Sequence, residues 1–137
     1  MAEKNRSEKL KRLVELQRHV ERMAENELAE TSRVREEVNR SMDRVIDAIG
    51  SVDPVHQVFS QNYAERFGRL MIKDQQLSGM QKLHEMKVMR ERTKGDRLEE
   101  NMREARSLEQ READDEAVYD IIDQQIATPA SSKLQKP

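Results

Sequence analysis

The sequence predicts an all-α protein, an elongated antiparallel two-helix coiled-coil hairpin whose second helix is the longer one. Charged residues make up 38% of the chain and aromatic residues 3%, so there is too little apolar material for an ordinary compact core. The 25 basic and 27 acidic side chains nearly balance, as in helices carrying pairs of opposite charge. Apolar residues recur at helical spacing over two long stretches separated by one turn signal. We therefore expect a single coiled-coil domain over residues 1–127.

The first predicted helix runs from about residue 7 to about residue 50, and Ser7 is its candidate N-cap. From Leu13 to Ile49 an apolar stripe covers 36 residues in 10 steps, or 3.6 residues per step. This is the period of a nearly straight helix with little supercoil. The stripe consists of Leu13, Leu16, Val20, Ala24, Leu28, Thr31, Val34, Val38, Met42, Val45 and Ile49.

A turn is predicted at about residues 51–58, within the stretch "AIGSVDPVHQVF". Gly50 is suited to a left-handed C-cap, because glycine adopts positive φ angles without steric cost. Pro54 prevents a simple continuation of the helix and restricts Asp53 to extended geometry.

The second helix is predicted over about residues 59–126. Gly68, Gly79 and Gly95 each cost about 0.8–1 kcal/mol relative to alanine inside a helix. The stretches "LSGMQ" and "TKGDR" are therefore the expected places for a bend or a break. Residues 128–137 combine Pro, Ser and Lys without periodicity, which predicts a disordered tail.

The unequal helices predict an unpaired segment. If residue 50 faces residue 59, residue 7 lies opposite residue 102, and residues 103–126 have no partner over ~36 Å at ~1.5 Å per residue. The same register predicts a salt bridge between Arg35 and Asp74. It also predicts seam contacts of Met86 and Met89 with Met23 and Val20.

No residue pattern indicates catalysis or a cofactor. The chain has no Cys, and its three histidines, His19, His56 and His84, lie far apart without ligand-spaced carboxylates, so we expect them on the surface or in the seam. A phosphate-binding loop, a nucleophile elbow and an HExxH motif are all missing from the sequence. We expect a protein that is not an enzyme and holds no metal or cofactor.

Nucleic acid and membrane spans are also not expected. The basic stretches "KLKR" and "MKVMRERTKGDR" alternate with or adjoin acidic residues, no aromatic accompanies them, and the predicted pI is near 6.0. The N-terminal sequence "MAEKNRSEKLKR" is followed by no continuous apolar stretch, so neither a signal peptide nor a membrane span is predicted. Cytoplasm is the expected compartment.

The first candidate partner surface is an aromatic row beside the turn. It consists of Phe59, Tyr63, Phe67 and Leu70, and across the seam we expect Met42, Val45 and Ile49. The row either closes the end of the hairpin as packing or leaves a ring exposed for a partner, and both roles are compatible.

The second candidate surface lies in the predicted unpaired segment. Residues 106–126 contain seven acidic and two basic residues, a net charge of −5. Acidic groups near a helix C-terminus oppose its dipole, so helix propensity does not explain them. An unpaired helix with a broad apolar arc is typical of a docking element or a site of self-association. The apolar residues are Val118, Tyr119, Ile121, Ile122 and Ile126.

The chain resembles the FliJ and YscO family of flagellar and type III secretion proteins over about residues 7–126. The resemblance rests on length, unequal helices, a turn near residue 52, and the runs "VFSQNYAERFGRLMIK" and "EQREADDEAVYDIIDQQIA". It implies a non-enzymatic, cytoplasmic coiled-coil stalk that links the export ATPase ring to the membrane protein of the export gate. It also implies peripheral contact with the inner membrane through these partners.

By the same resemblance, the aromatic row and its seam neighbours would contact the gate, and Tyr119, Ile122 and Ile126 would contact the ATPase. The alternative is a generic cytoplasmic coiled-coil scaffold that forms a homodimer through the unpaired segment or binds a partner helix.

Overall fold

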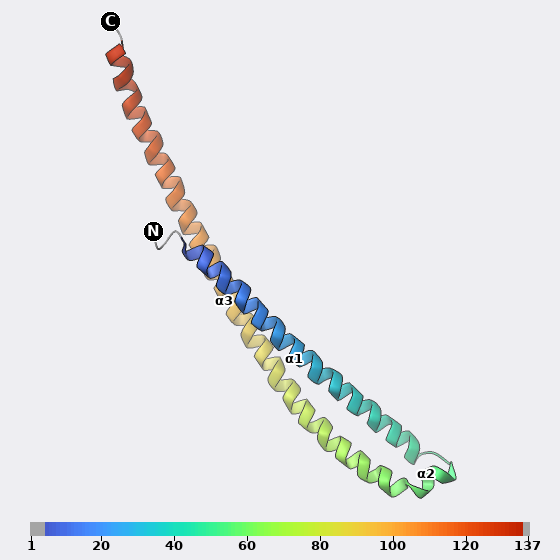
Figure 1. The fold of residues 1–137 in the computed structure, drawn as a ribbon. Coiled ribbons are helices and arrows are strands. Elements are labelled where there is room, and N and C mark those ends of the chain that lie inside the picture. The colour runs from blue at the N-terminus through green and yellow to red at the C-terminus, as the bar shows by residue number, and fades with distance from the viewer. Residues whose placement is uncertain (1–4, 136–137) are drawn as a thin grey trace. The chain divides into compact units, whose positions relative to one another are not determined.

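The computed structural model describes residues 5–135, and their side chains as far as residue 128 (Figure 1). Helix α1 spans Arg6–Ile49, α2 spans Pro54–Val58 and α3 spans Ser60–Gln135, and these residues contain no strand. The all-α prediction is confirmed, as is a second long helix that is longer than the first and packs against it. The contacts divide the chain into two units. Residues 16–95 form the hairpin unit, and residues 5–15 with 96–135 belong to the terminal unit.

In the hairpin unit, α1 and α3 pack antiparallel along a seam of buried and half-buried residues. On both helices these residues alternate spacings of three and four, which gives seven residues per two turns. A period of 3.5 is that of a left-handed coiled coil. On α1 they are Gln17, Glu21, Ala24, Leu28, Thr31, Arg35, Val38, Met42 and Val45. On α3 they are Tyr63, Phe67, Leu70, Asp74, Leu77, Gln81, His84, Val88, Glu91 and Gly95.

The predicted 3.6-residue stripe is therefore wrong in the first third of α1. Leu13 and Leu16 are exposed, whereas Val14 is buried and Gln17 is half-buried. The predicted methionine contacts are wrong as well, because Met86 and Met89 are exposed and Val88 between them is buried. In both places the seam follows the seven-residue repeat, and the larger apolar side chains lie beside it.

Polar side chains occupy several seam positions and bind across it. The predicted Arg35–Asp74 salt bridge is confirmed, with 2.9 Å between Arg35 Nε and Asp74 Oδ1, and Arg35 Nη1 also donates to Gln81 Oε1 at 3.2 Å. The Gln17 amide donates to the backbone carbonyl of Glu91 at 3.1 Å and to its carboxylate. These bonds satisfy polar groups that would otherwise weaken the seam.

The turn differs from its prediction in one respect. Gly50 donates its N–H to the Ile46 carbonyl at 3.0 Å, and no glycine among the described residues has a positive φ, so the left-handed cap is wrong. Asp53 is extended, as predicted, with φ −63° and ψ 127°, and its carboxylate accepts from the Val55 N–H at 3.0 Å. The predicted turn contains the short helix α2. Asp53 is its N-cap, and Pro54 occupies the first helical position, which proline favours.

Helix α3 is continuous through Gly68, Gly79 and Gly95, so neither predicted break occurs. It also extends to Gln135, past the start of the predicted tail, and residues 136 and 137 lie outside the described part of the chain. The Thr128 hydroxyl donates to the Gln124 carbonyl at 2.7 Å.

In the terminal unit, α1 begins at Arg6, so Ser7 lies inside the first turn and is not the N-cap that was predicted. A side chain of α3 caps this end of the helix instead. The Ser7 N–H donates to Glu109 Oε1 at 3.0 Å, and the Ser7 hydroxyl donates to the other carboxylate oxygen. Ser7 was predicted to lie opposite residue 102, so its partner is seven residues further along α3. Arg35 also binds two residues of α3 one heptad apart, Asp74 and Gln81, so a partner seven residues from the predicted one fits the same repeat.

Candidate protein-binding surfaces

Residues 110–128 of α3 are all exposed. The segment beyond the seam with α1 therefore begins near residue 110 and not at 103, since Ala105 is still buried. The predicted apolar residues are between 44% and 68% exposed. They are Val118, Tyr119, Ile121, Ile122 and Ile126, and we call them the C-terminal surface.

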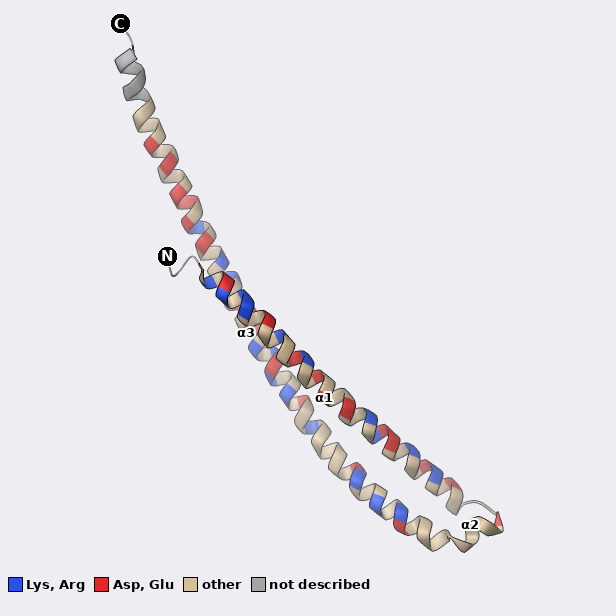
Figure 2. Cartoon of the chain, viewed as in Figure 1, with Lys and Arg blue, Asp and Glu red and all other residues tan. Residues whose placement is uncertain are grey.

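The seven-residue repeat of α3 continues into this segment, but acidic residues occupy most of its positions there. After Ala105 and Glu109, the next positions of the seven-residue repeat are Glu112, Glu116 and Tyr119. Residues 112–126 contain six acidic and no basic side chains, and Figure 2 shows the acidic residues along this part of α3. An α1 that extended further would therefore meet carboxylates where it needs apolar packing partners.

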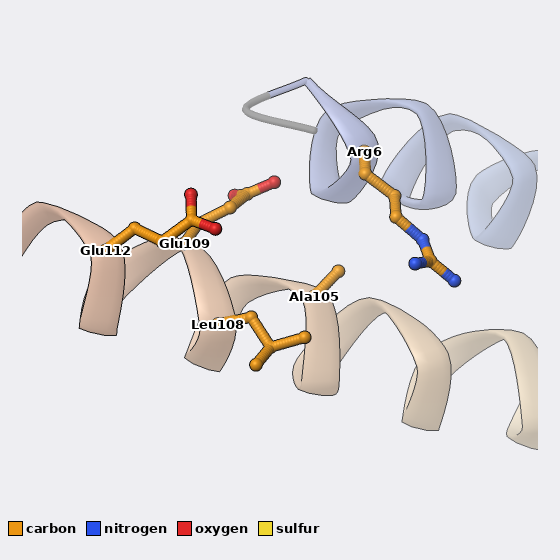
Figure 3. A pocket seen from close by; sticks show the side chains of 5 residues that line it. All are labelled: Arg6, Ala105, Leu108, Glu109 and Glu112. Carbon is orange, nitrogen blue, oxygen red and sulfur yellow. The ribbon is translucent and has the colours of Figure 1, made fainter. Parts of the chain in front are cut away.

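A small cavity of about 150 Å³ lies where α1 begins, and it is lined by Arg6, Ala105, Leu108, Glu109 and Glu112. Figure 3 shows the carboxylates of Glu109 and Glu112 on the side of the α1 start, while the Arg6 guanidinium points away from both. The hydrogen bonds from the Ser7 hydroxyl and then the Ser7 N–H hold the pKa of Glu109 below its ordinary value. Glu109 is therefore a charged cap at neutral pH, next to a second carboxylate and the exposed side chain of Leu108.

In the hairpin unit, the predicted aromatic row is only partly exposed. Phe59 is 45% exposed, whereas Tyr63, Phe67 and Leu70 are half-buried in the seam. The Tyr63 hydroxyl lies 2.9 Å from His56 Nδ1, and the two ring centroids are 5.8 Å apart. Tyr63 thus connects α3 to α2, which supports a packing role for this ring. Across the seam, Val45 is buried, Met42 is half-buried and Ile49 is exposed. Binding by this row stays a prediction.

The turn also exposes an apolar cluster that the sequence reading missed. Val52 is 89% exposed, and Val55 and Val58 are exposed as well, next to Phe59. We call the three valines the valine cluster. Their spacing of three residues in "SVDPVHQVF" was the available signal. Such a concentration of exposed apolar side chains within one turn indicates a contact surface.

The three histidines have ordinary surroundings. His84 Nδ1 lies 3.7 Å from the Glu27 carboxylate, His56 is next to Tyr63, and His19 is exposed. Within the part of the chain that the structure describes, no three His, Cys, Asp or Glu side chains form a group that could hold a metal ion. Among the same residues, no helix has an apolar stretch sufficient to cross a membrane.

Neither a family model, nor a curated protein, nor a solved structure matches this chain.

Proposed function

We propose that the chain is a non-enzymatic component of a flagellar or type III protein export apparatus, as its resemblance to the FliJ and YscO family implies. In this role it is a cytoplasmic coiled-coil stalk between the export ATPase ring and the membrane protein of the export gate. The observation that carries the proposal is the exposed stretch of α3 at residues 110–128. A helix that continues beyond its intramolecular partner and keeps a set of exposed isoleucines is suited to binding another protein.

The ATPase contact is assigned to Tyr119, Ile122 and Ile126, with Val118 and Ile121 beside them. Each of these side chains is about half or more exposed, and none of their positions is needed to hold α1 against α3. Complete burial of a fully exposed large apolar side chain contributes about 1.5–3 kcal/mol before the costs of association, and burial of these partly exposed side chains contributes a part of that.

The gate contact is assigned to the turn of the hairpin unit. Phe59 and Ile49 are exposed there, and the valine cluster adds three further apolar side chains. Tyr63, Phe67, Leu70, Met42 and Val45 support this surface from the seam. The same region thus combines packing and exposure, in line with the two compatible roles predicted for the aromatic row.

The ATPase half of the proposal is tested by truncation. We expect that removal of residues 112–137 abolishes co-purification with a hexamer-forming export ATPase and any change that the chain causes in its ATP hydrolysis. Removal of residues 128–137 is the matched control, because it leaves the C-terminal surface intact. If the longer truncation left both the complex and the hydrolysis rate unchanged, the stalk assignment would be abandoned.

The gate half is tested by substitutions in the turn. Phe59→Ala and Tyr63→Ala are expected to weaken binding of the purified cytoplasmic part of the gate protein while far-UV circular dichroism stays nearly constant. Tyr63→Phe keeps the ring and removes only the hydroxyl next to His56. Loss of helicity in the alanine variants would show that the row is packing and not a binding surface.

The alternative is a scaffold that forms a homodimer through the same segment, and its exposed isoleucines are the observation in its favour. Light scattering separates the two functions. A concentration-dependent dimer that Ile122→Asp abolishes would support the scaffold, whereas the stalk is expected to be largely monomeric without its partners.

A further inference from the structure

Residues 112–126 of α3 have an apolar side and an acidic side. At ~100° per residue, Val118, Tyr119, Ile122 and Ile126 lie within an arc of about 100°. Asp115 lies in the same arc, one turn before Val118 and Tyr119. The next arc of about 80° contains only acidic side chains in the same stretch. These are Glu112, Glu116, Asp120 and Asp123, and we call them the acidic row.

The acidic row lies along one edge of the apolar arc only. Tyr119 and Ile126 are its apolar neighbours, whereas the other edge carries Ile121 and Gln125 together with a single acid, Asp114. Asp114 lies about 165° around the helix from the middle of the acidic row, at ~100° per residue. Four of the six acidic residues of 112–126 thus lie on one side of the apolar arc.

A second copy of this chain is a poor occupant of such a surface. Residues 112–126 have six acidic and no basic side chains, so two copies packed through this arc would place carboxylates of one copy near carboxylates of the other with no basic side chain between them. Like charges placed opposite one another at an interface oppose binding and exclude wrong partners. The cavity beside the start of α1 has the same sign, since Glu109 and Glu112 line it and Arg6 points away from both (Figure 3).

We infer that the C-terminal surface docks into an apolar groove of its partner that has Lys and Arg side chains along one edge. The apolar arc of Val118, Tyr119, Ile122 and Ile126 enters the groove, and the acidic row faces the basic edge. Because four of the six acidic side chains lie on one side, the pairing fixes which way the helix is turned in the groove. This inference rests on the proposed function, which supplies the export ATPase as the partner, and it adds the chemistry of the partner surface.

The probe is the purified hexamer-forming export ATPase of the same organism, immobilised and titrated with the full-length chain at about 50 mM and about 500 mM NaCl. Asp123→Lys reverses one charge of the acidic row. We expect about tenfold weaker binding at low salt and a much smaller loss at high salt, because screening weakens exposed charge pairs. Ile122→Ala should weaken binding about tenfold at both salt concentrations, since it removes apolar contact.

Asp114→Lys is the matched control, because it makes the same change in net charge on the far side of the helix. We expect it to weaken binding less than about threefold at low salt. Residues 114, 122 and 123 are all exposed and lie beyond the seam, so circular dichroism of the variants should equal that of the parent chain.

The outcomes separate the inference from the proposed function. Equal losses for Asp114→Lys and Asp123→Lys, or tighter binding by Asp123→Lys, would overturn the basic edge while the ATPase partner stands. Binding that none of the three substitutions changes would overturn the docking surface. No binding of the parent chain at either salt concentration would remove the proposed ATPase contact and the inference with it. A homodimer that Ile122→Asp dissociates would make a second copy the occupant and would also overturn the inference.

Discussion

The glycines of α3 offer a sharp test of how closely the two helices approach. A Cβ atom added at Gly68 or Gly79 would meet nothing within 4 Å, outside the helix's own neighbouring backbone. Alanine is favoured over glycine in a helix interior by about 0.8–1 kcal/mol, so each of these substitutions should raise the free energy of unfolding by about that amount. The two sites are far enough apart along α3 that the double variant should gain about 2 kcal/mol.

Gly95 should respond differently because α1 lies against it. A Cβ there would lie 2.7 Å from Arg18 Nη1 and 3.1 Å from Arg18 Cζ, so the guanidinium must move. It also pairs with the Glu21 carboxylate at 2.8 Å. Weakening such a pair costs about 0.3–0.5 kcal/mol, so Gly95→Ala should gain only about half as much as Gly79→Ala.

The assay is urea unfolding followed by circular dichroism at 222 nm, with all variants analysed at one common m-value if their slopes agree. The background variant Arg18→Ala removes the obstructing guanidinium and should restore the full gain of Gly95→Ala. An equal gain at Gly79 and Gly95 in the parent chain would refute the close approach of Arg18. A loss of stability for Gly68→Ala or Gly79→Ala would refute the continuous α3.

Two further predictions concern the seam and its end. Val38→Ala should lower the free energy of unfolding by about 1–2 kcal/mol, since Val38 is buried, whereas Met89→Ala, at an exposed site, should change it by less than about 0.5 kcal/mol in the same urea assay. The Ser7 hydrogen bonds lower the pKa of Glu109, so the stability they contribute is present above the ordinary pKa of 4.5 and is lost as pH falls through the lower folded value. Ser7→Ala removes the largest cause and should raise that pKa toward 4.5, as measured by an NMR titration of the Glu109 carboxyl carbon; an unchanged pKa would refute the cap.

The all-helical fold was predictable because its signals are local. A helix-favouring composition, one strong turn signal at Pro54 and unequal lengths on either side of it predict two paired helices, the second of them longer. The Arg35–Asp74 salt bridge followed from the length arithmetic alone, and the structure has it. The fold class depends on the local sequence and the salt bridge depends on helix length, and both can be obtained from the sequence.

The seam itself was harder to predict because many of its positions are polar. Gln17, Glu21 and Asp74 occupy the seven-residue repeat, while Leu13 and Leu16 lie outside it. A search for apolar periodicity follows the leucines and so predicts 3.6 where the packing has 3.5. Polar seam residues become recognisable only once their cross-helix partners are known.

One of the candidate surfaces was predictable from the sequence and another was not. The exposed isoleucines of the C-terminal segment were found from helix length, because an unequal hairpin must leave part of one helix uncovered. The valine cluster was missed because Val52, Val55 and Val58 lie in a stretch treated as a turn, where α2 exposes them.

The glutamate that caps α1 recurs seven residues later in α3. Glu116 lies one heptad beyond Glu109, so a glutamate is also present at the equivalent position of the next repeat. Removal of residues 106–112 would keep Ala105 in the seam and bring Glu116 into the position that Glu109 now has. The isoleucine-bearing end would then lie about 10 Å nearer to the start of α1, at ~1.5 Å per residue, with its cap intact. A deletion of seven residues in this stretch therefore changes the distance between the C-terminal surface and the start of α1 while it keeps the seam and the cap.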